Sequence, residues 1–562
     1  MPGWTSSSST VRPYGVPIGL RIFGLHQRLP LSTHRLMVLI LTFIAYTCYH
    51  MSRRPISVVK NVLSRNCSQV IVPSDVIVTN TTENNWCDWQ PFNGEDANTL
   101  LGLLDSSFLF SYAICMFFSG FIAERCHLRY FLSLGMLLSG LLTYAFGIAF
   151  YYQIHSIYYF IFIQIICGAL QTSGWPAVVS SVGNWFGKSS RGLIFGIWNS
   201  HTNVGNILGA LIAGYYVEYN WGLSFIVPAI IIAIAGFIMF LFFTPYPEEV
   251  GISSVDIQCN NRIIRVSMNN TTENTGYGDN NESVSSTCSS TSQLETLSTQ
   301  QQHQQQQQQH RRKLRPIGGM TAVDDNNTDT IVLDEEHPLL TNETPMESTD
   351  KKAVSFMTAL KIPGVIEFSL CLFFAKLVSY TFLYWLPKYI GSSTDSSSSD
   401  SAYLSTPFDL GGIIGAIVAG VLVDVTGASA LICVVMLIWA IPLLFLYQLY
   451  GSVSYWHNII LQFITGTFVN GPYALITTAV SAELGTKLAN SHSLATVTAI
   501  IDGTGSIGAA IGPLFAGWVS QTGWNNVFYM VMMADLLALI SLARIAVQEC
   551  KRIARNRHRF NF

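Results

Sequence analysis

The stretch Tyr46-Thr-Cys-Tyr-His-Met-Ser-Arg-Arg-Pro55 places two adjacent arginines inside a long hydrophobic segment. The apolar run that starts at Leu36 is too short by Met51 for the roughly 20 residues of a membrane-spanning helix, so the span is expected to continue to Leu63. Arg53 and Arg54 then lie at a depth where a charge costs at least about 2.5 kcal/mol and usually faces a cavity or a partner. The alternative is that the pair anchors the span among lipid headgroups.

Helical spacing separates the two arginines. Arg53 shares one face of the predicted helix with Tyr46, Tyr49 and His50. We therefore interpret Arg53 as the better candidate for a binding residue and Arg54 as its structural neighbour.

The composition is that of a membrane protein with several spans. Of 562 residues, 50% are hydrophobic and 11% are charged, a combination that soluble domains of this length do not show. A formal net charge of −3 without a basic stripe excludes a nucleic-acid-binding protein. No nucleotide-binding loop, catalytic constellation or metal-ligand spacing is present, so we expect neither an enzyme nor a cofactor.

Hydropathy divides the chain into two groups of six spans. We expect an N-terminal bundle at 36–244 and a C-terminal bundle at 356–548, with a polar tail at 1–35 and a basic tail at 549–562. The Asn-, Ser-, Thr- and Gln-rich segment 245–355 cannot bury enough apolar surface to fold, which predicts a disordered linker.

The two predicted bundles repeat each other. Three patterns recur at nearly the same separation: Gly120-x-x-x-Glu124 as Gly420-x-x-x-Asp424, Gln164-x-x-x-Gly168 as Gln462-x-x-x-Gly466, and Ala213-Gly214-x6-Trp221-x3-Phe225 as Ala516-Gly517-x6-Trp524-x3-Phe528. Parallel repeats with a site between them are the architecture of major facilitator transporters. The predicted fold is an all-α membrane protein with twelve transmembrane helices in two homologous six-helix bundles.

Positive charges and sequons predict the orientation. The loop 64–98 contains glycosylation sequons at Asn66 and Asn80, which favours a lumenal, oxidising side where Cys67 and Cys87 can form a disulfide. Basic residues collect on the other side, which the positive-inside rule assigns to the cytosol together with both termini and the linker: Arg28, Arg35, Arg125, Arg129, Lys188, Arg191, Lys551, Arg552, Arg555, Arg557 and Arg559.

A second buried cation, Lys376, lies near the middle of the seventh predicted span. We interpret it as facing the central cavity opposite Arg53, and the pair as suited to a dianion such as phosphate. The alternative is a lysine neutralised by a carboxylate on a neighbouring helix, with three candidates: Glu367, Asp409 and Asp502. Asp502 is thus a candidate pairing or coupling residue.

Other polar residues of the spans are further candidates for a role in transport. His201 titrates near neutral pH and could follow the charge of a phosphate, or it could be a structural hydrogen-bond donor. Glu124, Arg125 and Asp424 are interpreted as charges of a cytosolic gate. In the linker, Glu335-Glu-His-Pro-Leu339-Leu340 is similar to an acidic dileucine signal, which would recruit sorting adaptors and favour endolysosomal traffic.

Several motifs resemble the sugar-phosphate exchangers of solute carrier family 37, in particular the exchanger 1 and 2 branch. The resemblance covers both bundles and is carried by Tyr49-His-Met-Ser-Arg-Arg-Pro-Ile-Ser-Val-Val-Lys60, Trp185-Phe-Gly-Lys188, Gly196-Ile-Trp-Asn-Ser-His-Thr-Asn-Val-Gly-Asn206, Trp221-Gly-Leu-Ser-Phe-Ile-Val-Pro228, Ala375-Lys-Leu-Val-Ser-Tyr-Thr-Phe-Leu-Tyr-Trp-Leu-Pro387, Asn470-Gly-Pro-Tyr-Ala-Leu-Ile-Thr-Thr-Ala-Val-Ser481 and Ile500-Ile-Asp-Gly-Thr-Gly-Ser-Ile-Gly508. It implies an organophosphate:phosphate antiporter that exchanges glucose 6-phosphate for inorganic phosphate in the endoplasmic reticulum membrane.

The resemblance also implies site residues. The family's phosphate-binding arginine corresponds to Arg53. Lys376 lies about one turn before the position of the bacterial partner arginine, and the bacterial histidine position falls on Thr202 rather than His201. The bacterial second-helix lysine is Met116 here. Within the quoted motifs, Trp198, Asn199 and Tyr380 are further candidates for substrate contacts.

Two other functions remain open from the sequence. A proton-coupled symporter of another organic anion would need a titrating carboxylate in the cavity, such as Asp409 or Asp502. A non-transporting sugar-phosphate sensor would bind without exchange.

Overall fold

The computed structural model describes residues 15–25, 29–65, 89–186, 197–252, 356–394, 396–485 and 493–560. These residues are helical or lie in turns and contain no strand. Most of the predicted linker lies outside them, including Glu335, Leu339 and Leu340, and so do Asn66, Cys67, Asn80 and Cys87. The prediction of disorder from residue 245 onward is wrong for its first residues, because 245–252 are described and contain a short helix at Pro247–Val250, where Glu249 is buried beside His127 and Arg129.

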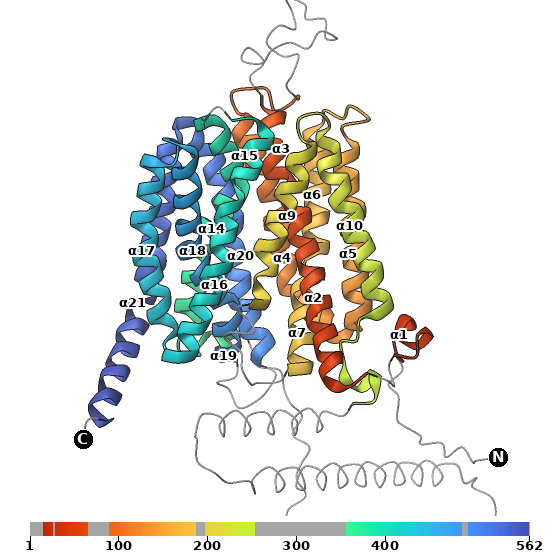
Figure 1. The fold of residues 1–562 in the computed structure, drawn as a ribbon, viewed down its shortest axis with the longest axis vertical. Helices are drawn as coiled ribbons and strands as arrows, with labels where there is room; N and C mark the ends of the chain where they lie inside the picture. Colours follow the sequence, from red (N-terminus) through yellow and green to blue (C-terminus); the bar gives the residue numbers. More distant parts are fainter. Residues whose placement is uncertain are drawn as a thin grey trace, which may run out of the picture. The chain divides into compact units, whose positions relative to one another are not determined.

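The helices form two groups that belong to one compact unit (Figure 1). The first group contains α2 (Leu31–Arg53), α3 (Pro55–Leu63), α4 (Ala97–Arg125), α5 (Leu128–Ile148), α6 (Ile157–Gln171), α7 (Gly174–Phe186), α9 (His201–Tyr216) and α10 (Trp221–Phe242), preceded by α1 (Ile18–Ile22) and followed by η3 (Pro247–Val250). The second contains α13 (Phe356–Leu360), α14 (Val365–Thr394), α15 (Ser398–Leu404), α16 (Thr406–Thr426), α17 (Ser429–Tyr450), α18 (Tyr455–Leu475), η4 (Ile476–Val480), α19 (Ser481–Gly485), α20 (Ser493–Val519), η5 (Ser520–Thr522) and α21 (Trp524–Phe560).

Eleven helical segments of the described residues are long and apolar enough to cross a membrane. They match eleven of the predicted spans. The remaining predicted span, 190–217, is described from residue 197 onward and contains α9.

The first span is two helices instead of the single helix expected from its hydropathy. Pro55 has no backbone N–H and its ring conflicts with the carbonyl one turn earlier, so α2 ends at Arg53 and a new helix starts at Pro55. This break places both arginines at a helix junction in the interior of the protein.

The surface of the described helices is apolar, unlike that of a soluble protein. Large apolar side chains point outward, with Phe118, Leu141 and Trp518 each more than half exposed, as expected for surfaces that face lipid. Charged side chains are buried instead, among them Arg53, Arg54, Lys60, Asp105, Lys376, Asp409 and Asp502. Intramembrane charges of this kind mark the functional interior.

Several helix pairs join the bundles. Helix α4 packs along α20, as Figure 1 shows, and α9 packs against α16. The first pair approaches closely because Gly102 has no side chain: a Cβ there would lie 3.1 Å from the Pro513 carbonyl oxygen. Small residues allow such close helix contacts in membranes.

Candidate functional site

Arg53 lines a cavity at the end of α2, together with Phe108, Gln171 and Tyr384. Its Nε donates to Gln171 Oε1 (2.6 Å), and its guanidinium carbon lies 4.7 Å from the centre of the Tyr112 ring. Its Nη2 has no hydrogen-bond partner among the described residues, and no described carboxylate forms a salt bridge with Arg53. The aromatic face and the amide hold the guanidinium in place, and an N–H group remains available for an anion.

Arg54, unlike Arg53, is held by contacts with the other bundle. It donates to the carbonyl oxygen of Leu383 and to Ser405 Oγ (2.8 Å), and its Nη2 lies 3.8 Å from Asp409 Oδ2. All three partners belong to the C-terminal bundle. Arg54 therefore ties the α2–α3 junction to α14 and α16, whereas Arg53 stays open to the cavity.

Lys376 is paired, and the expectation of an uncompensated cation is wrong. Its Nζ lies 2.7 Å from Asp502 Oδ1 in a buried salt bridge, which is the alternative that the sequence left open. The pairing has a physical cause: α14 and α20 touch at glycines, and a Cβ at Gly508 would lie 2.0 Å from the Phe373 carbonyl oxygen. Close packing brings the two side chains within reach, and an unpaired charge at this depth would be costly.

Arg53 and Lys376 lie near the same residues at the interface between the bundles. His50 and Tyr112 both interact electrostatically with Arg53 and with Lys376. Because Asp502 offsets the charge of Lys376, the three ionised groups together carry an excess positive charge that comes from Arg53. The region can thus attract an anion.

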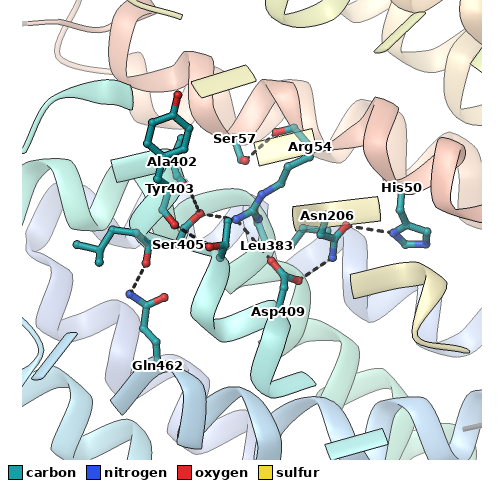
Figure 2. Close-up of polar contacts among 12 residues, drawn as sticks. His50, Arg54, Ser57, Asn206, Leu383, Ala402, Tyr403, Ser405, Asp409 and Gln462 are labelled. Carbon is teal, nitrogen blue, oxygen red and sulfur yellow. Dashed lines mark hydrogen bonds and ion pairs between the residues drawn. The ribbon is translucent and has the colours of Figure 1, made fainter. Parts of the chain in front are cut away.

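A second cavity includes His50, Asn206, Tyr380 and Asp409 in its wall. Figure 2 shows a chain of polar contacts along it: His50 Nδ1 and Asn206 Oδ1 are 3.3 Å apart, and Asn206 Nδ2 donates to Asp409 Oδ1 (2.9 Å). Asp409 in turn lies beside Arg54 (Figure 2). The chain connects the cavity to the contact between the bundles.

Several candidates from the sequence lie in the packing of the N-terminal bundle. The Tyr49 hydroxyl is 3.0 Å from Ser173 Oγ, and Trp198 Nε1 donates to Thr42 Oγ1 (3.2 Å). His201 is fully buried against the rings of Trp198 and Tyr46. None of these three lines either cavity, and Asn199 is buried without doing so.

The proposed gate charges lie at corresponding helix ends. Arg125 is the last residue of α4 and Asp424 lies near the end of α16, both exposed. Glu124 belongs to α4, but its side chain is outside the described part of the chain.

Sequence reasoning missed three residues at or near the Arg53 cavity: Lys60, Asp105 and Gln171. Lys60 forms a buried ion pair with Asp105 and donates to the Tyr384 carbonyl oxygen (3.0 Å). Charged residues inside predicted spans are a usable signal, and Lys60 and Asp105 both show it. Gln171 has no such signal, since a glutamine near a helix end is unremarkable.

The described features agree with comparisons to known proteins. The sequence model of the Major Facilitator Superfamily matches residues 42–271 and 368–557. The chain is 49% identical over 523 residues to the glucose-6-phosphate exchanger SLC37A2 of Danio rerio, which covers 92% of this chain and 94% of that protein. It is 43% identical over 558 residues to the glucose-6-phosphate exchanger SLC37A1 of Mus musculus, with 95% and 96% covered.

Solved structures show the same fold at low identity. A bacterial homolog of the human lysosomal transporter Spinster, in an inward-facing and unoccupied conformation, superposes with a TM-score of 0.55 at 14% identity. The match covers 92% of this chain and 97% of that chain.

Proposed function

Because the chain belongs to the major facilitator superfamily and, within it, to the SLC37 family of exchangers, we propose that it exchanges glucose 6-phosphate for inorganic phosphate across a membrane. It is a multi-pass membrane transporter and not an enzyme. Exchange would proceed by alternating access, in which the two bundles rock around a central site.

The observation that carries the proposal is the unpaired guanidinium of Arg53. Its Nη2 is buried at the wall of a cavity without a partner among the described residues. A phosphate oxygen is the acceptor that such a group fits, because guanidinium–phosphate hydrogen bonds are charge-assisted. Both inorganic phosphate and a phosphate ester present these oxygens.

Lys376 would join Arg53 only when substrate is bound. Phosphate oxygens compete with Asp502 for the ammonium group and draw it away from a partner that is 2.7 Å distant. Without substrate, Lys376 stays on Asp502 and Arg53 keeps an uncompensated charge that opposes closure of the cavity. In this mechanism transport still depends on a bound anion, although Lys376 is neutralised by Asp502 when no substrate is present.

The test is exchange in vesicles that contain the purified protein and are loaded with phosphate. We expect Arg53→Ala to lower the uptake of labelled phosphate by roughly tenfold or more at subsaturating concentration, since a hydrogen bond to a charged group contributes about 1.5–3 kcal/mol. Arg53→Lys keeps the positive charge but lacks the planar set of N–H donors of the guanidinium group, so it should retain part of the activity.

Arg21→Ala is the matched control, because Arg21 lies exposed in α1 and bonds to the Val16 carbonyl oxygen of the same segment. Its exchange rate should equal that of the unmodified protein. Unchanged exchange in Arg53→Ala would contradict the assignment of Arg53 to phosphate.

A proton-coupled symporter is the second candidate, and Asp409 in the wall of the second cavity is the observation that favours it. Uptake by a symporter collapses when a proton uncoupler is added to the vesicles. Exchange that persists with the uncoupler would support the antiporter.

We also propose the endoplasmic reticulum membrane as the location, with an endolysosomal membrane as the alternative, and cytosolic termini. The basic residues Lys551, Arg552 and Arg555 near the end of α21 support the orientation through the positive-inside rule. Figure 1 shows this end of α21 on the same side as the start of α2. Loss of glycans after replacement of Asn66 and Asn80 would support a lumenal position of the loop that contains them.

A further inference from the structure

The second cavity has the chemistry of a binding site for hydroxyl groups. Its wall combines the amides Asn203, Asn206 and Asn470 with the hydroxyl of Ser379 and the rings of Tyr380 and Tyr473. Amides donate and accept hydrogen bonds, as hydroxyl groups do. The cavity lies between the bundles, because Asn203 and Asn206 belong to α9 and the other four residues to α14 and α18.

Two of these polar groups are buried without a partner. Asn470 Nδ2 and Ser379 Oγ form no hydrogen bond to any described residue, although the two side chains are only 5% and 6% exposed. A buried polar group without a partner costs about 1–3 kcal/mol. Both face a cavity, so a ligand with hydroxyl groups can supply the missing partners.

Gly412 of α16 leaves the room that these amides use. A Cβ at this position would lie 2.8 Å from Asn470 Nδ2 and 2.9 Å from Asn203 Oδ1. Any larger residue would push into the space between the two amides. The glycine therefore lets one side chain from each bundle point at the same volume.

This cavity is adjacent to the one that Arg53 lines. His50 and Arg53 lie three residues apart on α2, and Tyr380 and Tyr384 four apart on α14, with one residue of each pair in each cavity wall. Such positions are neighbours on a helix, about 5–6 Å apart. A phosphate ester of a hexose can bridge this separation.

We propose that the second cavity binds the sugar part of a sugar phosphate whose phosphate group is held by Arg53. Asn470, Asn203 and Ser379 hydrogen-bond the sugar hydroxyls and determine specificity for the ester. The assignment rests on the proposed function, since it assumes a sugar phosphate as one of the two substrates. Inorganic phosphate has no sugar part and does not need the second cavity.

The experiment compares two substrates in one preparation of vesicles loaded with unlabelled phosphate. We expect Asn470→Ala to raise the KM for labelled glucose 6-phosphate by about tenfold, a factor equivalent to about 1.4 kcal/mol, with less change in the KM for labelled phosphate. Gly412→Ala should likewise raise the KM for glucose 6-phosphate more than the KM for phosphate, because its methyl group intrudes on the amides. Ser379→Ala removes one hydroxyl with little change of volume and should show a smaller difference between the two KM values.

Thr467→Val is the matched control on α18, because the Thr467 hydroxyl bonds to the Phe463 carbonyl oxygen of its own helix (2.9 Å). It should leave both KM values unchanged. Equal increases for both substrates in Asn470→Ala, Gly412→Ala and Ser379→Ala, or no increase for either, would overturn the sugar site. Failure of the unmodified protein to exchange glucose 6-phosphate for phosphate would instead overturn the proposed function.

Discussion

Arg53 and Lys376 are both buried cations, but their surroundings give them different energies. Arg53 has an amide and aromatic rings as neighbours and keeps an N–H group without a partner in the described part of the chain, whereas Lys376 has a carboxylate at 2.7 Å. In the mechanism that we propose, Arg53 is the permanent anion-binding group and Lys376 is a second cation that joins it only when substrate is bound. The free energy of the Lys376–Asp502 pair decides how easily substrate recruits the lysine.

The pair predicts a non-additive effect on stability. Lys376→Ala should destabilise the protein by roughly 3–5 kcal/mol because it leaves Asp502 buried without a counter-charge. The double variant Lys376→Met with Asp502→Leu removes both charges, so its unfolding temperature should be closer to that of the unmodified protein. Thermal unfolding of the purified protein measures both, and a double variant that is less stable than Lys376→Ala would refute the coupling.

Glycines determine how closely several helices approach each other. The pairs α14–α20 and α4–α20 approach at Gly508 and Gly102, where a Cβ would meet backbone oxygens at 2.0 Å and 3.1 Å. These contacts set the rotation and depth of α20, and with them the position of Asp502. The packing of α20 against its neighbours thus determines where the Asp502 carboxylate lies, which the sequence of α20 alone does not determine.

A pair of matched Gly→Ala substitutions tests this role. Gly508→Ala should lower the unfolding temperature, since overpacking typically costs about 1–3 kcal/mol. Gly120→Ala, also in a helix, meets no described atom within 4 Å and should not lower it. Equal unfolding temperatures for the two variants would contradict a packing role of Gly508.

Across the whole described unit, polar contacts join the bundles at the end that contains α3 and α15 (Figure 1). Lys60 donates to the Tyr384 carbonyl oxygen (3.0 Å), Asn61 Nδ2 to the Pro387 carbonyl oxygen (3.2 Å) and Arg65 to Ser398 Oγ (3.4 Å). Alternating access requires these contacts to break and re-form during each cycle.

A reversible cross-link tests the requirement. The side-chain amide of Asn61 lies 3.3 Å from the position of a Cβ built at Gly391, so Asn61→Cys with Gly391→Cys can form a disulfide between the bundles. Oxidation should abolish exchange and a reducing agent should restore it, while either single variant stays active under oxidation. Full activity of the cross-linked protein would exclude separation of the bundles at this end.

The sequence predicted much of the fold and part of the site. The spans and the repeat were readable because hydropathy over a window is a local property, and Arg53, His50 and Tyr380 do line cavities. Tyr49, Trp198 and His201 were plausible for the same local reasons, yet they pack inside one bundle. Polarity and helical face did not distinguish a cavity wall from a bundle interior.

By itself, the sequence determined that the chain is a two-bundle membrane protein with a costly arginine inside its first span, because both follow from the composition of continuous segments. Only the tertiary structure decided which buried charges are paired and which amides face a shared space. Lys376 and Asp502 are 126 positions apart, and Asn203 and Asn470 belong to different bundles. Their meeting depends on how closely and at what rotation helices pack, which is a property of the assembled fold.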